Sequence, residues 1–373
     1  MFFGIGKPYF LGIDFGTSLI KAVELTLENG QPKLLKYGQV GLARLEKGTL
    51  TGDNSYEDEM VLYLRALLEQ FHPKSTGVYA AMPAFTGLIS TMELPEMDED
   101  ELKEAVQFEA HKYIPSSLED VALSWEVVGV RRPETGGGSA KMEILLVAAL
   151  NKEVARYRKY IRDVHLETNF LELETFSLVR SIIGQDPGVF LLIDIGSRAT
   201  NLVLVDDGLV KVSRNLDVGG RDITRTLTES LHITPPRAEA LKKSGKDFLN
   251  QPESPLVFPA LETISNEAKR MLLSYQNKYP ERQCQGIILS GGTAQFTGLT
   301  AYYARIFDLP VRVGDPWHAI GYDEERRAEV KQLGTSFSVA LGLALAGIDE
   351  LIHKKKNLLK KPFSLKSLLA KKL

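Results

Sequence analysis

The sequence of 373 residues contains one cysteine, Cys284, and six histidines that lie far apart. A single cysteine excludes an intramolecular disulfide framework, and the scattered histidines lack the short spacings of a structural zinc site. We therefore expect a protein of a reducing compartment, and the cytoplasm fits best.

Two common nucleotide-binding motifs are also missing. No stretch matches the P-loop pattern G-x-x-x-x-G-K-[ST], and GIGKPY at 4–9 lacks the third glycine of a dinucleotide fingerprint. P-loop and Rossmann readings of the chain are therefore excluded.

Features that would direct the chain into a membrane are scarce. The start MFFGIGKPYF lacks the basic region and the long apolar region of a secretory signal, so we expect none. The longest run of small apolar residues, SVALGLALAGI at 338–348, is too short to span a bilayer.

Acidic residues are absent from the C-terminal stretch 354–373, which carries eight lysines. Removing these eight charges from the formal net charge of −3 leaves −11 for the remaining chain. An acidic body argues against nucleic-acid binding and indicates that the basic tail is a separate device.

A repeat within the sequence gives the first positive signal. Residues 192–205, LIDIGSRATNLVLV, repeat residues 12–25, GIDFGTSLIKAVEL, and align Asp14 with Asp194, Gly16 with Gly196 and Thr17 with Ser197. One such turn between apolar runs is an ordinary hairpin signal. Its recurrence 180 residues later predicts two related halves.

Each repeated turn has the composition of an anion site. Glycine allows successive N–H groups to point into one concavity, and the hydroxyl of threonine or serine adds a donor. The carboxylate at the strand end would repel phosphate unless a hydrated divalent cation such as Mg²⁺ lies between them. Two facing copies predict a clamp for a phosphate chain and its metal.

Two glycine pairs extend this pattern. GIILSGGTAQFTGL at 286–299 places Gly291 and Gly292 after a short strand, where a backbone without side chains can approach a base or ribose. LDVGGRDITRTL at 216–227 places Gly219 and Gly220 before a predicted helix that Asp222 would cap.

The order of these elements resembles the superfamily of actin, heat-shock chaperones and sugar kinases, and within it the PilM family of type IV pilus assembly. The narrower resemblance comes from AVQFEAHKYIPSSLEDVALSWEVV at 105–128 and SFSVALGLALAG at 336–347. It covers about residues 9–350. It implies an α/β, actin-like (ribonuclease H-like) duplicated two-lobe fold with an inserted small α+β subdomain.

Periodicity and turn residues place the elements within this plan. We expect strands over 9–45, a helix over 56–71, a strand at 77–85, and a helix over 97–114 with Asp98 as its N-cap. A helix capped by Asn151 should follow a hairpin. The predicted domains are a first lobe (9–87 and 151–189), the insert (88–150), a second lobe (190–221 and 261–350), a small helical subdomain (222–260) and the basic tail (351–373).

The resemblance implies a site for ATP or ADP with Mg²⁺, in which Asp14 and Asp194 hold the metal. Lys21 would reach the phosphates unless strand alternation turns it to solvent. Glu267 and Arg270 would reach the nucleoside or form only a solvated pair. Glu172 or Glu174 could position water for hydrolysis, which we expect to be slow at most. The full predicted set is Asp14, Gly16, Thr17, Ser18, Lys21, Asp194, Gly196, Ser197, Gly219, Gly220, Glu267, Arg270, Gly291 and Gly292.

The resemblance also implies a partner, the cytoplasmic N-terminal peptide of a PilN-like bitopic inner-membrane protein, and a location at the inner face of that membrane. Phe108, Tyr113 and Trp125 are candidates for its groove, although aromatic residues at such spacings are more often core. Pilus motor ATPases or the platform protein are further expected partners, self-association stays open, and the tail 354–373 predicts either an amphipathic membrane-binding helix or a solubilising segment.

Three alternatives share the fold. An FtsA-like protein would tether cell-division filaments to the membrane, and an L-type cytoplasmic component would serve type II secretion. A small-molecule kinase is the third, and it is disfavoured because no acceptor-site aspartate stands out in the first half. Fold alone does not separate them.

Overall fold

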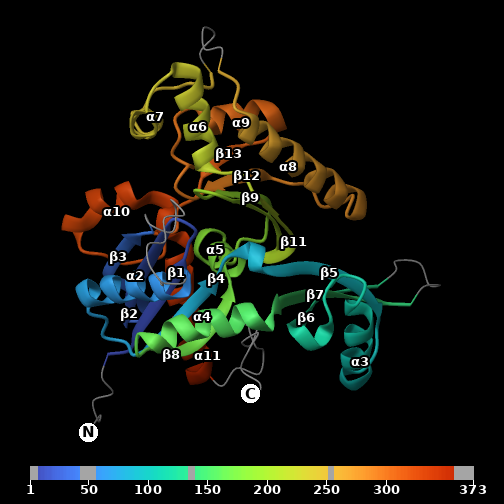
Figure 1. The fold of residues 1–373 in the computed structure, drawn as a ribbon. Helices are drawn as coiled ribbons and strands as arrows, with labels where there is room; N and C mark the ends of the chain where they lie inside the picture. Colours follow the sequence, from blue (N-terminus) through green and yellow to red (C-terminus); the bar gives the residue numbers. More distant parts are fainter. Residues whose placement is uncertain (1–6, 43–55, 133–138, 251–255, 357–373) are drawn as a thin grey trace.

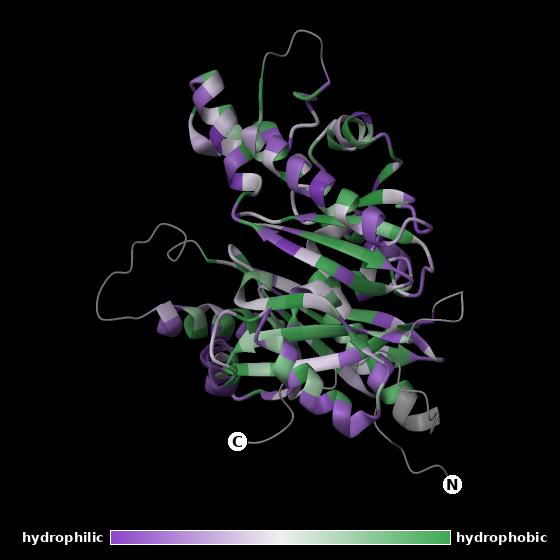
Figure 2. Cartoon of the chain, turned by 90° about the vertical axis from the view of Figure 1, so that its right-hand side faces the viewer, coloured by the Kyte–Doolittle hydropathy of each residue, from purple (hydrophilic) through white to green (hydrophobic). Residues whose placement is uncertain are grey.

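The computed structural model describes the backbone of residues 7–42, 56–132, 139–250 and 256–356. Two lobes lie one above the other, and a smaller sheet extends sideways at their junction (Figure 1). Each lobe contains a five-stranded sheet whose strands are mostly hydrophobic, while the outer helices carry polar residues (Figure 2).

The two large sheets have the same layout. The first has the order β3-β2-β1-β4-β8 and the second β11-β10-β9-β12-β13. In both, the first three strands form an antiparallel meander, and the next two strands run parallel to the first strand of the meander. The predicted two related halves are therefore confirmed. The strands are β1 (Tyr9–Phe15), β2 (Leu19–Glu28), β3 (Gln31–Gly41), β4 (Gly77–Met82), β8 (Glu167–Leu173), β9 (Val189–Ile195), β10 (Thr200–Asp206), β11 (Leu209–Leu216), β12 (Gly286–Ser290) and β13 (Val311–Val313).

The helices follow the predicted order, and the helix predicted over 56–71 has the same bounds in the structure. Strand β8 leads directly into α5. The helices are α2 (Tyr56–Phe71), α3 (Glu99–Ala110), α4 (Asn151–Asp163), α5 (Glu174–Ile182), α6 (Gly220–Leu231), α7 (Pro235–Lys242), α8 (Pro259–Lys278), α9 (Leu299–Phe307), α10 (Arg327–Leu333) and α11 (Ser338–Lys356).

The insert has a sheet and a core of its own. Its strands β5 (Gly87–Pro95), β6 (Val121–Arg131) and β7 (Lys141–Leu150) pair in the order β5-β7-β6, with α3 packed on one face. Asp98 caps α3 as predicted, because its carboxylate accepts hydrogen bonds from the backbone N–H groups of Asp100 and Glu101. The helix ends at Ala110, four residues earlier than predicted, because the chain turns there before Pro115.

One predicted cap is wrong. Leu150 is the N-cap of α4, and the Asn151 amide instead donates a hydrogen bond of 2.9 Å to the Glu119 carbonyl. The Asn151 side chain therefore ties α4 to the start of β6 and leaves the helix end uncapped by a side chain.

The insert also contacts the second lobe through charges. Glu143 of β7 accepts from Lys211 of β11 at 2.7 Å, and Lys278 at the end of α8 pairs with Glu93 of β5 at 3.2 Å. Both Lys211 and Glu143 are largely buried, with 9 % and 13 % of their side chains exposed. Removing one partner of such a pair leaves an uncompensated charge, so the insert is held to the second lobe.

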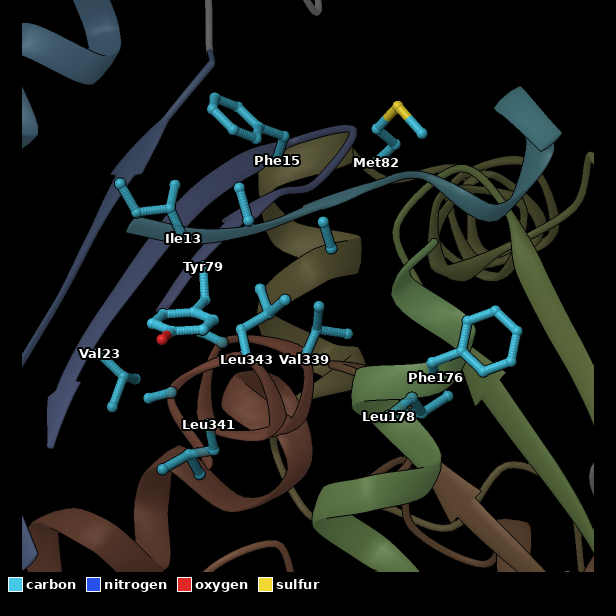
Figure 3. Packing of buried hydrophobic residues seen from close by; sticks show 14 of the residues in the cluster. Ile13, Phe15, Val23, Tyr79, Met82, Phe176, Leu178, Val339, Leu341 and Leu343 are labelled. Carbon is cyan, nitrogen blue, oxygen red and sulfur yellow. The ribbon is translucent and has the colours of Figure 1, made fainter. Parts of the chain in front are cut away.

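Helix α11 forms the centre of the first lobe. The stretch Glu324–Ile352 is long and apolar enough to cross a membrane by length and composition, but most of its apolar window is buried inside the protein. Figure 3 shows Val339 and Leu343 of α11 beside Tyr79 of the sheet, with Leu178 of α5 nearby. Most of the run at 338–348 is therefore part of the core.

Glycines allow α11 to approach its neighbours very closely. A Cβ added to Gly342 would lie 1.9 Å from the Ser177 carbonyl oxygen of α5, and one added to Gly12 of β1 would lie 2.2 Å from the Ala340 carbonyl oxygen. The obstructing atoms are backbone, so a side chain at either position would push two elements apart.

We predict that Gly342→Ala destabilises the protein. Alanine normally improves a helix by about 1 kcal/mol relative to glycine, but here the clash should outweigh this gain and leave a net loss of roughly 2 kcal/mol or more. Urea unfolding would measure the loss. Gly41→Ala is the control, because its nearest atom lies 3.9 Å away. Equal stability of the two variants would contradict the described crossing of α5 and α11.

Candidate functional site

The two repeated turns have the same backbone contact. A Cβ on Gly16 would lie 2.7 Å from the carbonyl oxygen of Leu19, and a Cβ on Gly196 would lie 2.9 Å from that of Ala199, the equivalent residue. The Gly196 N–H also donates to the Ala199 carbonyl at 3.0 Å. Both glycines are required by this close approach, and neither has a positive φ.

Three acidic side chains and one lysine come together beside these turns. Asp14 ends β1, Asp194 ends β9, and Glu174 begins α5. Lys21 of β2 lies opposite Asp14 in the sheet register, and its Nζ is 3.6 Å from Asp14 Oδ2. Lys21 therefore points into the site rather than to solvent, which resolves the alternative left open by strand alternation.

The protonation equilibria of these groups show how strongly they interact. Burial and, after it, the neighbouring charges of Asp14 and Asp194 together raise the pKa of Glu174 to about 8, although the Ala84 N–H that bonds Glu174 Oε1 at 2.9 Å lowers it. Burial likewise raises the pKa of Asp194 to about 6 and that of Asp14 above its usual range. The Lys21 ammonium opposes each of these shifts without cancelling them.

Glu172, the other residue predicted to position water, has a different role. Its carboxylate is 1 % exposed and forms two hydrogen bonds with the Arg180 guanidinium, of 2.8 and 3.1 Å. Arg180 also donates to the Gly342 carbonyl at 3.0 Å. Glu172 therefore secures the crossing of α5 and α11, and we remove it from the candidate site.

Gly219 and Gly220 also differ from their predicted role. Both are buried against the second turn, where the Gly220 N–H donates to the Gly196 carbonyl at 2.8 Å. The Gly219 N–H donates to the Asp222 carboxylate, so Asp222 acts from inside the first turn of α6 and not as the N-cap. These glycines dock α6 onto the second turn and do not offer their N–H groups to a ligand.

The other glycine pair, Gly291 and Gly292, is open to solvent on one side. Gly291 has φ +84° and packs on the end of β9, where a Cβ would lie 2.4 Å from the Ile195 carbonyl oxygen. Gly292 is exposed, and a Cβ there would meet nothing within 4 Å. Gly291 thus fixes the loop beside Asp194, and Gly292 leaves room above it.

Glu267 and Arg270 are not brought to these loops. They pair with each other at 3.3 Å, and Glu267 also lies 3.9 Å from Arg214 of β11. Strand β11 is the far edge of the sheet from β12, which leads to Gly291. The face of α8 turned to α9 carries Lys269, Leu272 and Gln276 instead. We therefore remove Glu267 and Arg270 from the candidate site.

Two residues of α7, Lys242 and Glu239, lie beside the start of α6 and were not predicted from the sequence. Lys242 of α7 donates to the Gly220 carbonyl at 3.1 Å and to the Thr224 hydroxyl at 3.0 Å, and it pairs with Glu239 at 2.7 Å. Hydrogen bonds from Lys242 and Thr224 outweigh burial and lower the pKa of Glu239 to about 2. The only sequence signal was their helical spacing of three residues, which is common on solvated helix faces.

The donor set fits a hydrated divalent cation. The carboxyl groups of Asp14, Asp194 and Glu174 all have raised pKa values, mainly because they are buried, and a bound cation would favour their charged forms. Within the described residues, no three acidic, histidine or cysteine side chains are close enough to hold an ion by themselves. Magnesium commonly keeps several waters and takes further oxygens from phosphates, which suits such a set.

The family description "Type IV pilus assembly protein PilM" matches residues 12–348. The chain belongs to this PilM family. Its fold is the actin-like two-lobe fold, because a solved PilM-PilN type IV pilus biogenesis complex matches it with a TM-score of 0.73 at 24 % identity, over 91 % of this chain and 98 % of that one.

More distant members of the fold class are also similar. MreB5 of Spiroplasma citri bound to ADP has a TM-score of 0.53 at 15 % identity, over 94 % of this chain and 98 % of that one. The cell division protein FtsA of Pseudomonas aeruginosa is 22 % identical over 91 % of this chain and 89 % of its own length. These similarities support the fold, while the family match separates the chain from FtsA.

We predict that Glu174 makes the ligand-free protein less stable as pH rises. An acid whose pKa is raised by folding binds its proton more tightly in the folded state, so its contribution is full below the unfolded value of 4.5 and is lost as pH rises toward about 8. Glu174→Gln removes this loss. Because one pKa unit corresponds to about 1.4 kcal/mol, the variant should melt measurably higher than wild type at pH 8 and equally at pH 4.5.

Thermal unfolding without nucleotide, followed from pH 4.5 to 8, measures this difference. Glu325→Gln, an exposed acid far along the chain, is the control and should follow the wild-type curve. If the melting temperature of Glu174→Gln instead follows that of wild type at every pH, folding does not raise the pKa of Glu174.

Proposed function

We propose that this chain is a nucleotide-binding scaffold of type IV pilus assembly, which binds Mg-ATP or Mg-ADP between its lobes and a cytoplasmic peptide of a PilN-like inner-membrane protein on its insert. The observation that carries the nucleotide proposal is the convergence of two equivalent glycine turns with Asp14, Asp194 and Lys21.

The turns would hold the phosphates from both lobes. Gly16, Thr17 and Ser18 offer donors from the first lobe and Ser197 from the second, while Gly196, whose N–H bonds the Ala199 carbonyl, shapes the second turn; all five are partly exposed. Asp14 and Asp194 would hold the cation through its waters, and the bound cation would neutralise the phosphate charges. Because one ligand contacts both turns, it stabilises the arrangement in which the lobes are close.

The nucleoside end would lie over the open glycine. Gly292 leaves space for a flat group, and Lys242 and Glu239 border the same junction from α7. Glu174 is placed beside both aspartates and can hold a water molecule when ionised. Its pKa of about 8 means that the carboxyl is mostly protonated near neutral pH, which fits slow hydrolysis at most.

The partner peptide would bind a groove of about 550 Å³ on the insert. Phe108 of α3 is 75 % exposed and lines this groove with Leu118 and Leu123, while Glu104 and Glu119 add negative charge. An exposed phenylalanine beside other apolar side chains marks an interaction surface. We infer that an extended apolar peptide with a basic residue fits it.

The other two predicted aromatic residues contribute less. Tyr113 is 36 % exposed, whereas Trp125 packs against the core of the insert. Trp125 is therefore a core residue, as the alternative interpretation held. Contacts with pilus motor components, self-association and membrane attachment stay predictions, and the lysine-rich tail beyond Lys356 lies outside the described residues.

Asp14→Asn and Asp194→Asn should each weaken Mg-ATP binding about tenfold or more, since each loses a charge that would hold the cation. Calorimetric titration measures the dissociation constants. Glu267→Gln is the matched control in the second lobe, because Glu267 pairs with Arg214 outside the site. Unchanged affinity in both aspartate variants would show that Mg-ATP does not bind beside Asp14 and Asp194.

Phe108→Ala should weaken binding of the N-terminal cytoplasmic peptide of the PilN-like protein by about tenfold, because an exposed aromatic anchor is lost. Fluorescence anisotropy with a labelled peptide measures it. Leu273→Ala is the control, since Leu273 is similarly exposed, at 61 %, on the second lobe. If wild type shows no saturable binding, the insert does not receive this peptide.

A further inference from the structure

Arg221 is bonded to both repeated turns. It is the second residue of α6, and its backbone N–H donates to the Ser197 carbonyl of the second turn at 2.9 Å. Its guanidinium Nη2 donates to the Ser18 hydroxyl of the first turn at 3.2 Å. One residue therefore connects the two turns, which belong to different lobes.

The backbone of Arg221 is held in place by its neighbours. Gly219 and Gly220 are buried against the second turn, and the carboxylate of Asp222 accepts from the Gly219 N–H at 2.8 Å. Adding a Cβ at Gly220 would also bring it to 2.5 Å from the Thr293 hydroxyl. The start of α6 is thus rigid, and the guanidinium reaches the first turn from a fixed point.

Helix stability does not explain an arginine at this position. The N-terminal turn of a helix carries partial positive charge, so a cation there is unfavourable. Arg225, one turn further along α6, is different: it pairs with Asp222 at 2.7 Å and is 67 % exposed. The positive charge of Arg221 is therefore placed where the cleft needs it and not where the helix does.

The present partner in the first turn is a weak one for this cation. A serine hydroxyl is neutral, whereas phosphate offers several charged oxygens to the planar guanidinium and can bind two of its N–H groups at once. A phosphate seated on the first turn would lie next to Ser18, within the reach that the 3.2 Å bond already shows.

We propose that Arg221 binds the terminal phosphate of a nucleoside triphosphate. The lobes would therefore be closer together with a bound triphosphate than with a bound diphosphate, which lacks that phosphate. This inference rests on the proposed nucleotide site and names a specificity determinant within it. A phosphate on the first turn would replace the Ser18 hydroxyl as a hydrogen-bond partner of the guanidinium.

The test compares triphosphate and diphosphate in the full chain. Mg-ATP and Mg-ADP are titrated into wild type, Arg221→Gln and Arg221→Lys, and Arg225→Gln serves as the control on the same helix. Arg221→Gln should bind ATP about tenfold more weakly while ADP affinity changes less than about twofold. Arg221→Lys should give an intermediate ratio, because it keeps the charge without the planar fork.

A second readout follows the lobes directly. Small-angle scattering should show a smaller radius of gyration for wild type with a non-hydrolysable ATP analogue than with ADP, and this difference should be lost in Arg221→Gln. A melting curve for each variant confirms that it is folded, and Arg221→Lys carries the comparison if the glutamine variant is not.

The outcomes separate the two proposals. Wild type that binds neither nucleotide overturns the proposed function and this inference with it. Normal binding by wild type, combined with an unchanged ATP to ADP ratio or with equal weakening of both in Arg221→Gln, overturns this inference alone. Tighter ATP binding in Arg221→Gln also overturns it, because Arg221 would then be blocking the site.

Discussion

The burial of three carboxyl groups at one place is the constraint on which this molecule depends. Asp14, Asp194 and Glu174 come from both halves of the chain and meet beside Lys21, which balances only part of their charge. Burial is the largest cause of the raised pKa of each of these carboxyl groups. A bound cation would offset the cost of burying these charges, so that cost would also favour cation binding.

Tight packing in the rest of the first lobe fixes the positions of Asp14 and Glu174. Helix α11 packs so tightly on β1 and α5 that Gly12 and Gly342 have no room for a methyl group. The buried pair of Glu172 and Arg180 ties the same crossing and includes the Gly342 carbonyl. Rigid packing of this kind fixes Asp14 at one end of β1 and Glu174 at the start of α5.

The sequence predicted the repeated turns well because each half encodes its turn locally, in Asp14 with Gly16 and in Asp194 with Gly196. Local signals also located α2 and the Asp98 cap. Long-range partners could not be predicted in the same way. Glu172 and Glu174 are two residues apart with equal chemistry, and only the tertiary fold pairs one with Arg180 and turns the other into the cleft. Gly219, Glu267 and Lys242 differ from expectation for the same reason, because strand order and helix facing decide their neighbours.

The contact between Lys211 and Glu143 has a thermodynamic consequence. It joins the insert, which carries the groove at Phe108, to the lobe that carries Asp194. If opening and closing of the lobes alters this contact, peptide and nucleotide become linked ligands, and each must change the affinity of the other by the same factor. The peptide of the membrane protein would then change the affinity for nucleotide, just as the nucleotide would change the affinity for the peptide.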